Sequence, residues 1–210
     1  MVWNKGICSV LIMASDYGTL ELLEHISSNY QYRTQYNATV ADLTVAFAVD
    51  FQTAGERLTK KVSKDKYLGF LLSDTVGEHP LHIAAKIKKW CIDKEVRTLN
   101  IAGNGLYTLC EYDWTQEKIN IFMYTVLKAL KNSSITKIIS GGQTGVDYAG
   151  LVAGYSLGYA VCGTFPKGFR QRNEEGIDYT QTEVEVRRRI IDDASKLPEV
   201  FAGQKSIFFD

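Results

Sequence analysis

The chain has 210 residues, enough to bury a hydrophobic core, and its 45% apolar and 23% charged residues are typical of globular proteins. Its 24 Lys and Arg residues balance 24 Asp and Glu residues, which excludes the basic excess of a general nucleic-acid-binding protein. No apolar run is long enough for a membrane span, no signal peptide pattern is present, and Cys8, Cys91, Cys110 and Cys162 are scattered. We therefore expect a cytoplasmic protein with no nucleic-acid partner, no membrane partner and no metal site.

The first 40 residues give the weakest pattern. Residues 7–13 are consistent with a strand and residues 20–27 with a helix, whereas residues 29–38 are polar and rich in tyrosine. We treat residues 1–40 as an N-terminal extension packed on the core.

From residue 41 onward, short apolar runs alternate with longer amphipathic segments. The runs at 43–49, 67–72, 97–102, 135–139 and 159–165 predict strands, and the segments at 81–91, 115–130, 146–157 and 183–197 predict helices. Such an alternation is typical of β-α-β units. We therefore predict an α/β fold over residues 41–210, a single Rossmann-like domain. Its open, mostly parallel sheet has about five or more strands, with helices on both faces.

The carboxyl ends of parallel strands meet at one edge of a sheet, where ligands bind. Residues 50–56, 103–108, 140–147 and 166–170 follow four of the predicted strands. The densest of these segments is Ser140-Gly141-Gly142-Gln143-Thr144-Gly145. Backbone N–H groups at the start of the following helix, with Lys167 and Arg170 from the next strand, would bind a phosphate or an acidic cofactor. The same glycines can merely let the helix pack closely on the sheet, but their density favours ligand contact.

Other polar residues at this edge have two interpretations. Gly103-Asn104-Gly105 fits a ligand contact and a plain turn equally well. Thr53-Ala54-Gly55-Glu56 has the spacing of a capping box, and helix capping is the preferred role for Glu56. Because a carboxylate would repel a phosphate, Asp147 either caps its helix or faces a ribose hydroxyl or an amide. No NTPase phosphate loop and no complete dinucleotide fingerprint occurs.

One stretch resembles a known family. Residues 140–147, together with Gly163, Pro166-Lys167-Gly168 and Glu175-Gly176-Ile177, look like the molybdenum-cofactor carrier family. That family belongs to the SLOG superfamily of Rossmann-like proteins, which includes YpsA-type and LOG-type proteins. The match covers about residues 135–180. The resemblance implies a nucleotide-like or phosphate-bearing ligand, bound by Gly141, Gly142, Thr144, Gly145, Lys167 and Gly168.

The sequence also departs from these relatives. Tyr148 stands where the family usually has Arg, and about 40 residues follow Pro-Lys-Gly, so the missing strands must come from residues 43–50 and 97–102. LOG-type proteins are phosphoribohydrolases with a Pro-Gly-Gly-x-Gly-Thr-x-x-Glu loop. Here Ser140 replaces that proline, and Asp147 takes the place of the glutamate.

The leading hypothesis is a cytosolic protein that binds a nucleotide-derived or phosphorylated small molecule, such as an ADP-ribose-like or cyclic nucleotide signal. The alternatives are a nucleotide N-glycosidic hydrolase with Asp147 or Glu56 as acid or base, a molybdenum-cofactor carrier, and a protein–protein interaction module. No cofactor other than the nucleotide-like ligand is expected, and a homo-oligomer is plausible. The predicted ligand-binding residues are Ser140, Gly141, Gly142, Gln143, Thr144, Gly145, Asp147, Lys167, Gly168, Arg170, Gly103, Asn104 and Gly105.

Overall fold

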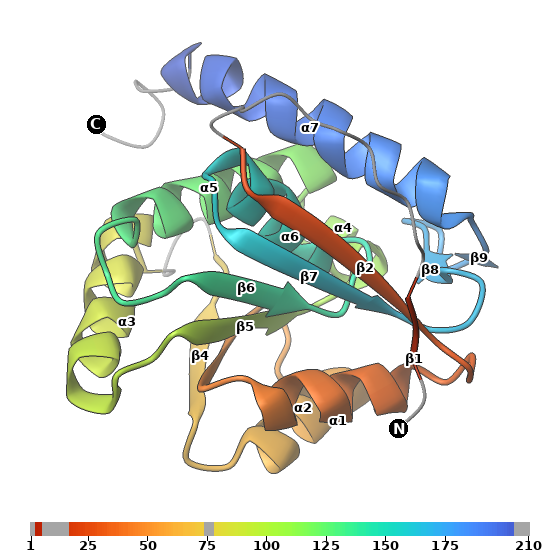
Figure 1. The fold of residues 1–210 in the computed structure, drawn as a ribbon, viewed down its shortest axis with the longest axis horizontal. Coiled ribbons are helices and arrows are strands. Elements are labelled where there is room, and N and C mark those ends of the chain that lie inside the picture. Colours follow the sequence, from red (N-terminus) through yellow and green to blue (C-terminus); the bar gives the residue numbers. More distant parts are fainter. Residues whose placement is uncertain (1–2, 6–16, 74–77, 204–210) are drawn as a thin grey trace.

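The computed structural model describes residues 3–5, 17–73 and 78–203, and its centre is a seven-stranded sheet (Figure 1). Strands β2, β7, β6, β5, β3 and β4 lie in that order and are parallel, and β1 is antiparallel to β2 at the edge. The predicted α/β class and mostly parallel sheet are therefore confirmed. The strand bounds are β1 Trp3–Lys5, β2 Thr19–His25, β3 Leu43–Ala48, β4 Tyr67–Leu71, β5 Thr98–Gly103, β6 Lys137–Ser140 and β7 Ala160–Phe165.

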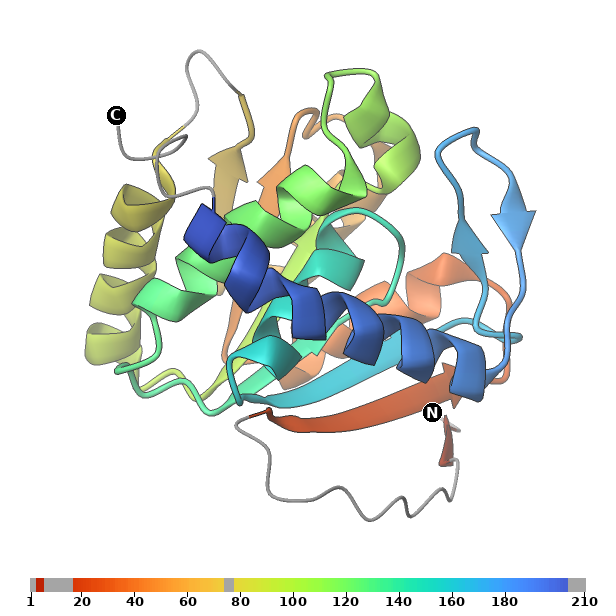
Figure 2. The same cartoon turned by 90° about the horizontal axis from the view of Figure 1, so that it is seen from above.

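Helices cover both faces of the sheet, as predicted. Figures 1 and 2 show α1 (Tyr30–Val40) and α2 (Ala54–Ser63) together on one face. The other face carries α3 (Pro80–Lys94), α5 (Gln116–Ala129), α6 (Val146–Ser156) and α7 (Glu183–Gly203). A short helix, α4 (Leu106–Cys110), follows β5, and a small hairpin of β8 (Gln171–Arg172) and β9 (Asp178–Tyr179) follows β7. Within the described part of the chain, no helix is long and apolar enough to cross a membrane.

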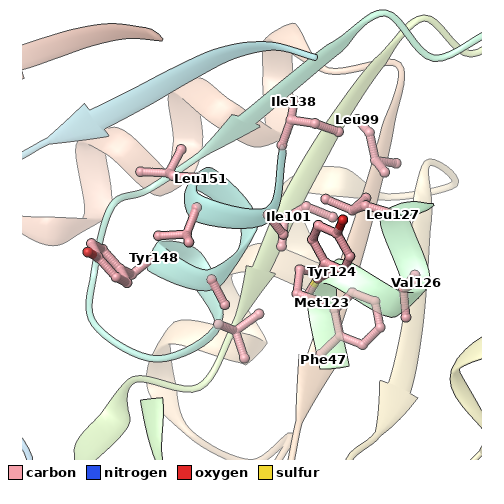
Figure 3. Close-up of a cluster of buried hydrophobic side chains, with 14 of the residues drawn as sticks. Phe47, Leu99, Ile101, Met123, Tyr124, Val126, Leu127, Ile138, Tyr148 and Leu151 are labelled. Atoms are coloured by element: carbon pink, nitrogen blue, oxygen red, sulfur yellow. The ribbon is translucent and has the colours of Figure 1, made fainter. Parts of the chain in front are cut away.

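The core lies between the central strands and the helices α5 and α6. All six residues of β3 are buried, as expected for a strand covered on both faces. Figure 3 shows Phe47, Ile101 and Met123 meeting between the sheet and these helices. Gly150 brings α6 close to β5, because a Cβ there would lie 2.8 Å from Cβ of Ile101. The prediction of a closely packed helix over residues 146–157 is confirmed.

The prediction of a helix over residues 20–27 is wrong, because Thr19–His25 forms strand β2. A short segment with three leucines fits either periodicity, and pairing with β7 decides the outcome. The predicted strand at residues 7–13 lies outside the described residues. The two strands expected from the N-terminal half are present: β3 pairs with β5, and β5 pairs with β6. Strand β6 leads directly into residues 140–145, which we call the Gly-Gly loop.

After the neighbouring strands β3 and β5, the chain continues on opposite faces of the sheet. After β3 the chain enters α2 on one face, whereas after β5 it continues through α4 into α5 on the other (Figure 1). The loops that follow the two strands therefore diverge at the carboxyl edge and leave a crevice between them. In open α/β sheets this switch point is the usual place for a ligand.

Candidate functional site

A cleft of about 650 Å³ opens at this switch point, a volume within the ordinary range for small-molecule sites. It lies among the start of α1, the β3–α2 loop, the β5–α4 loop, the Gly-Gly loop and β8. We call it the ligand cleft. Its lining residues are Asn29, Tyr30, Gln31, Arg33, Thr34, Thr53, Ala54, Gly55, Glu56, Leu58, Gly103, Asn104, Gly105, Leu106, Tyr107, Thr108, Gln143, Thr144 and Arg172.

Asn104 holds two walls of the ligand cleft together. Its Oδ1 accepts hydrogen bonds from the backbone N–H groups of Val49 (2.9 Å) and Asp50 (3.0 Å), and its Nδ2 donates to the Asp50 carbonyl at 3.0 Å. These bonds link the loop after β3 to the loop after β5. Asn104 is buried, so its side chain fixes the backbone of both loops. Gly103, Asn104 and Gly105 all line the ligand cleft, so this segment forms one of its walls.

Helix α2 begins in the wall of the ligand cleft. Thr53 caps it, and its Oγ1 accepts a hydrogen bond from the Glu56 N–H at 3.4 Å, so the Thr53 half of the predicted capping box is confirmed. The preferred capping role for the Glu56 side chain is wrong. Glu56 lines the ligand cleft, and its Oε2 is buried with no hydrogen-bond partner. Next to it, a Cβ at Gly55 would meet nothing within 4 Å.

Glu56 is only 4% exposed, and its surroundings disfavour a negative charge. Burial raises its pKa from 4.5 to about 8, and the nearby carboxyl groups of Asp147 and Asp50 act in the same direction. At neutral pH most Glu56 side chains therefore carry a proton. A neutral carboxyl group can donate and accept hydrogen bonds, so Glu56 can contact either kind of ligand atom.

Asp147 forms a buried ion pair with Arg33, at 2.7 Å between Oδ2 and Nη1. Burial raises the pKa of Asp147, whereas Arg33 and backbone hydrogen bonds with Gln143 and Gly103 lower it. The pairing with α1 was not predicted, and the predicted roles of Asp147, capping its helix or facing a ribose hydroxyl or amide, stay predictions. Gly141 makes room for the pair, because a Cβ there would lie 1.3 Å from Arg33 Nη1.

Backbone groups of the Gly-Gly loop mostly bind other parts of the protein. The N–H groups of Thr144, Gly145 and Val146 donate to Gln143 Oε1 (3.0 Å), Gln116 Oε1 (2.6 Å) and the Asn104 carbonyl (3.2 Å). These are the groups that we expected to bind an anion at the start of α6. Ser140 is fully buried, and its hydroxyl donates to the Ile101 carbonyl at 2.7 Å.

Two glycines of this loop are required by backbone geometry. Gly142 and Gly145 have φ angles of 69° and 86°. A Cβ at Gly142 would lie 2.3 Å from the Phe165 ring, and a Cβ at Gly145 would lie 2.6 Å from the Asn104 carbonyl oxygen. Close packing therefore accounts for both glycines. The residues by which this loop lines the ligand cleft are Gln143 and Thr144.

The segment after β7 lies beside the ligand cleft. The Lys167 side chain is exposed, and the Gly168 N–H donates to Glu24 Oε1 at 2.5 Å. Arg170 pairs with Asp178, and its guanidinium carbon lies 5.6 Å from the centre of the Tyr30 ring. Among the described residues, these three predicted site residues do not line the ligand cleft. Arg172 lines it instead.

Sequence reasoning missed the contribution of α1, which places Tyr30 and Arg33 in the ligand cleft. One local signal existed: Asn29 is the N-cap, and its Oδ1 accepts a hydrogen bond from the Gln31 N–H at 2.9 Å. That signal locates the start of the helix, but it does not reveal that Arg33 reaches Asp147. The described residues contain no cluster of three or more His, Cys, Asp or Glu side chains suited to a metal ion.

Comparison with known proteins agrees with this arrangement. The family model described as "Circularly permutated YpsA SLOG family" matches residues 11–108 and 138–188, more than half of the chain. A comparison with curated proteins gave no match. The resemblance to the SLOG superfamily is thus confirmed at the level of the superfamily, through a different family from the molybdenum-cofactor carriers. A permuted order fits a sheet in which β3 and β5 precede the Gly-Gly loop in sequence yet lie beside it. The chain belongs to the circularly permutated YpsA SLOG family.

Proposed function

We propose that this protein is a cytosolic binding protein for a nucleotide-derived or phosphorylated small molecule, which occupies the ligand cleft. The observation that carries the proposal is the position of this cleft of about 650 Å³ at the switch point between β3 and β5. Membership of the SLOG family implies a nucleotide-derived ligand in general. ADP-ribose-like and cyclic nucleotide signals are the ligands that we favour.

The first turn of α2 is the best place for an anionic group of this ligand. Its first N–H groups, at Ala54 and Gly55, have no partner inside the helix, and both residues line the ligand cleft. A charged Glu56 in this turn would repel a phosphate. Its pKa of about 8 keeps it largely neutral at physiological pH, which removes that obstacle.

The opposite rim supplies positive charge. Arg170 and Arg172 both pair with Asp178, so two guanidinium groups share one carboxylate. The result is a local excess of one positive charge beside Tyr30, whose hydroxyl donates to Asp178 at 3.0 Å. An anion in the ligand cleft would thus find favourable groups at α2 and at this rim.

A second candidate function is the hydrolysis of an N-glycosidic bond in a nucleotide. The observation that favours it is the pKa of Glu56, because a general acid works best when its pKa lies near the working pH. Glu56 fits this role better than Asp147, since Arg33 already occupies the Asp147 carboxylate. Molybdenum-cofactor binding is an alternative for the same cleft, and homo-oligomerisation stays a prediction that light scattering would check.

A thermal-shift screen with AMP, ADP, ADP-ribose, cyclic nucleotides and molybdopterin tests the proposal. A ligand at 100 times its Kd should stabilise the protein by about 2.7 kcal/mol. Absence of stabilisation by every compound would contradict the proposal. Chromatography of the ligand after incubation separates the two candidates, because a hydrolase releases the free base and a binding protein returns the ligand intact.

Gly55→Leu is the matched variant for this screen. A Cβ at this position would meet nothing within 4 Å, and we expect the rest of the leucine side chain to extend into the ligand cleft and block it. Gly55→Ala is the control: it leaves most of that space open and favours the helix by about 0.5–1 kcal/mol. We expect both variants to fold and only Gly55→Leu to lose the ligand-induced shift. Equal shifts in the two variants would place the ligand elsewhere.

A further inference from the structure

A second, smaller pocket of about 60 Å³ adjoins the ligand cleft on its inner side. We call it the inner pocket. Arg33, Thr34, Gly55, Glu56 and Gly103 line both spaces, so the inner pocket continues the cleft towards strand β5. A water-sized group needs about 10–15 Å³ of such space, so the inner pocket has room for several hydroxyl-sized groups.

Three buried polar atoms without a hydrogen-bond partner belong to residues that line this pocket. They are Arg33 Nε from α1, Glu56 Oε2 from α2 and Asn100 Oδ1 from β5. Two further atoms of this kind in the described residues, on Tyr67 and Arg189, belong to residues that line neither space. Each such atom costs about 1–3 kcal/mol, so their gathering around one pocket calls for a group that satisfies them.

Two of these side chains are held in place at their other ends. The amide nitrogen of Asn100 donates to Thr44 Oγ1 at 3.2 Å, which leaves Oδ1 as the available acceptor. Arg33 Nη1 is held by Asp147 at 2.7 Å, and the buried Nε of the same guanidinium group has no hydrogen-bond partner. The donor and the acceptor are therefore positioned before any ligand arrives, which lowers the entropic cost of binding.

The chemistry of the three atoms selects the group that fits. Arg33 Nε can only donate and Asn100 Oδ1 can only accept, whereas the Glu56 carboxyl group accepts in either protonation state. A phosphate or carbonyl oxygen would satisfy Arg33 but not Asn100. An ammonium group would satisfy the acceptors but would be repelled by Arg33. A hydroxyl group donates and accepts at once, and two adjacent hydroxyls would serve all three atoms.

Resting on the proposed function, we propose that the inner pocket binds the 2′- and 3′-hydroxyls of a ribose, so that the protein selects ribonucleotide over deoxyribonucleotide ligands. Of the two favoured ligand classes, this selects ADP-ribose-like ligands, because the 3′-oxygen of a 3′,5′-cyclic nucleotide is esterified. The rest of the nucleotide would extend into the ligand cleft past Gly55, where the missing side chain leaves the way open. Its phosphate would lie at α2 or the arginine rim. Tyr30 and Tyr107 line the same cleft and are the aromatic side chains that the base would meet there.

Calorimetric titration with matched nucleotides tests this inference. AMP and ADP are each compared with their 2′-deoxy and 3′-deoxy counterparts on the full chain. We expect the loss of either hydroxyl to weaken binding about 10- to 100-fold, because it leaves buried polar atoms unsatisfied again. If ribo- and deoxyribonucleotides bind equally, the inner pocket holds only water and the inference is wrong, while the proposed function stands. If none of these nucleotides or the screened compounds binds, both fail.

Variants of the pocket atoms give an independent readout. Asn100→Ala and Glu56→Met each remove one hydrogen-bonding group, and either should reduce the ratio of ribo to deoxy affinity at least several-fold. Having both keeps the test decisive if the buried Asn100→Ala change prevents folding. Tyr67→Phe is the matched control, because it removes another buried oxygen without a partner, from a side chain outside both spaces. An unchanged ratio in folded Glu56→Met would overturn the assignment of Glu56 to this pocket.

Discussion

The stability of this protein should depend on pH through Glu56. The folded-state pKa of about 8 lies well above the ordinary value of 4.5. Below pH 4.5 the carboxyl group is protonated in the folded and unfolded states alike. Between pH 4.5 and pH 8 the unfolded chain loses this proton first, so the free energy of unfolding falls as the pH rises. The difference of about 3.5 pH units corresponds to about 5 kcal/mol at most.

Glu56→Gln isolates this contribution, because glutamine has nearly the same shape and no charge to bury. Urea unfolding at pH 5, 6.5 and 8 would give the free energy of unfolding of both proteins. We expect the wild type to lose several kcal/mol more than Glu56→Gln between pH 5 and pH 8, through this single group. Parallel pH profiles would refute the reasoning, since they would mean that Glu56 ionises normally in the folded state.

Four further outcomes follow from the geometry. Asp147→Ala leaves a buried guanidinium without its carboxylate and should cost about 3–5 kcal/mol in chemical unfolding. Asn104→Ala removes three hydrogen bonds between two loops and should cost about 1–3 kcal/mol, with faster amide exchange at Val49 and Asp50. Gly142→Ala should destabilise the fold by about 1–3 kcal/mol, because φ is 69° and an aromatic ring lies in the way; it is therefore a poor test of ligand binding. The division into residues 1–40 and 41–210 stays a prediction, and circular dichroism of the 41–210 fragment tests it. Because β2 pairs with β7, loss of cooperative unfolding in that fragment would contradict the division, and cooperative unfolding would support it.

Periodicity was enough to predict strands β3 to β7 and helices α3, α5, α6 and α7, whereas the short elements α4, β8 and β9 were not predicted. Each of these segments carries a signal of its own: β3 is a continuous apolar run, and α5 repeats its apolar residues at helical spacing. The segment at residues 19–25 carries no such signal. It forms a strand because it pairs with β7: Thr19 lies opposite Ala160, which is 141 positions later in the chain. Pairing between segments so far apart cannot be recognised from the local sequence.

The position of the candidate site in the fold could be predicted from the sequence more readily than the residues that line it. Glycines and parallel strands pointed to the right edge of the sheet, and Asn104, Gln143 and Thr144 do line the ligand cleft. The density of glycines suggested an anion site, yet Gly141 and Gly142 are explained by the space that a side chain would take from Arg33 and from an aromatic ring. A pattern of glycines indicates that another group lies close to the backbone, but it does not show whether that group is a ligand or a side chain of the protein.

Local charge, rather than net charge, decides what the ligand cleft can hold. The chain carries 24 basic and 24 acidic residues, and within the cleft Arg33 is already neutralised by Asp147. Attraction for an anion must then come from the start of α2, the arginine rim around Asp178 and the protonated state of Glu56. Of these three, only Glu56 changes near neutral pH. Anion affinity should therefore weaken as the pH rises through about 8, and the neutral amide of Glu56→Gln should abolish that dependence.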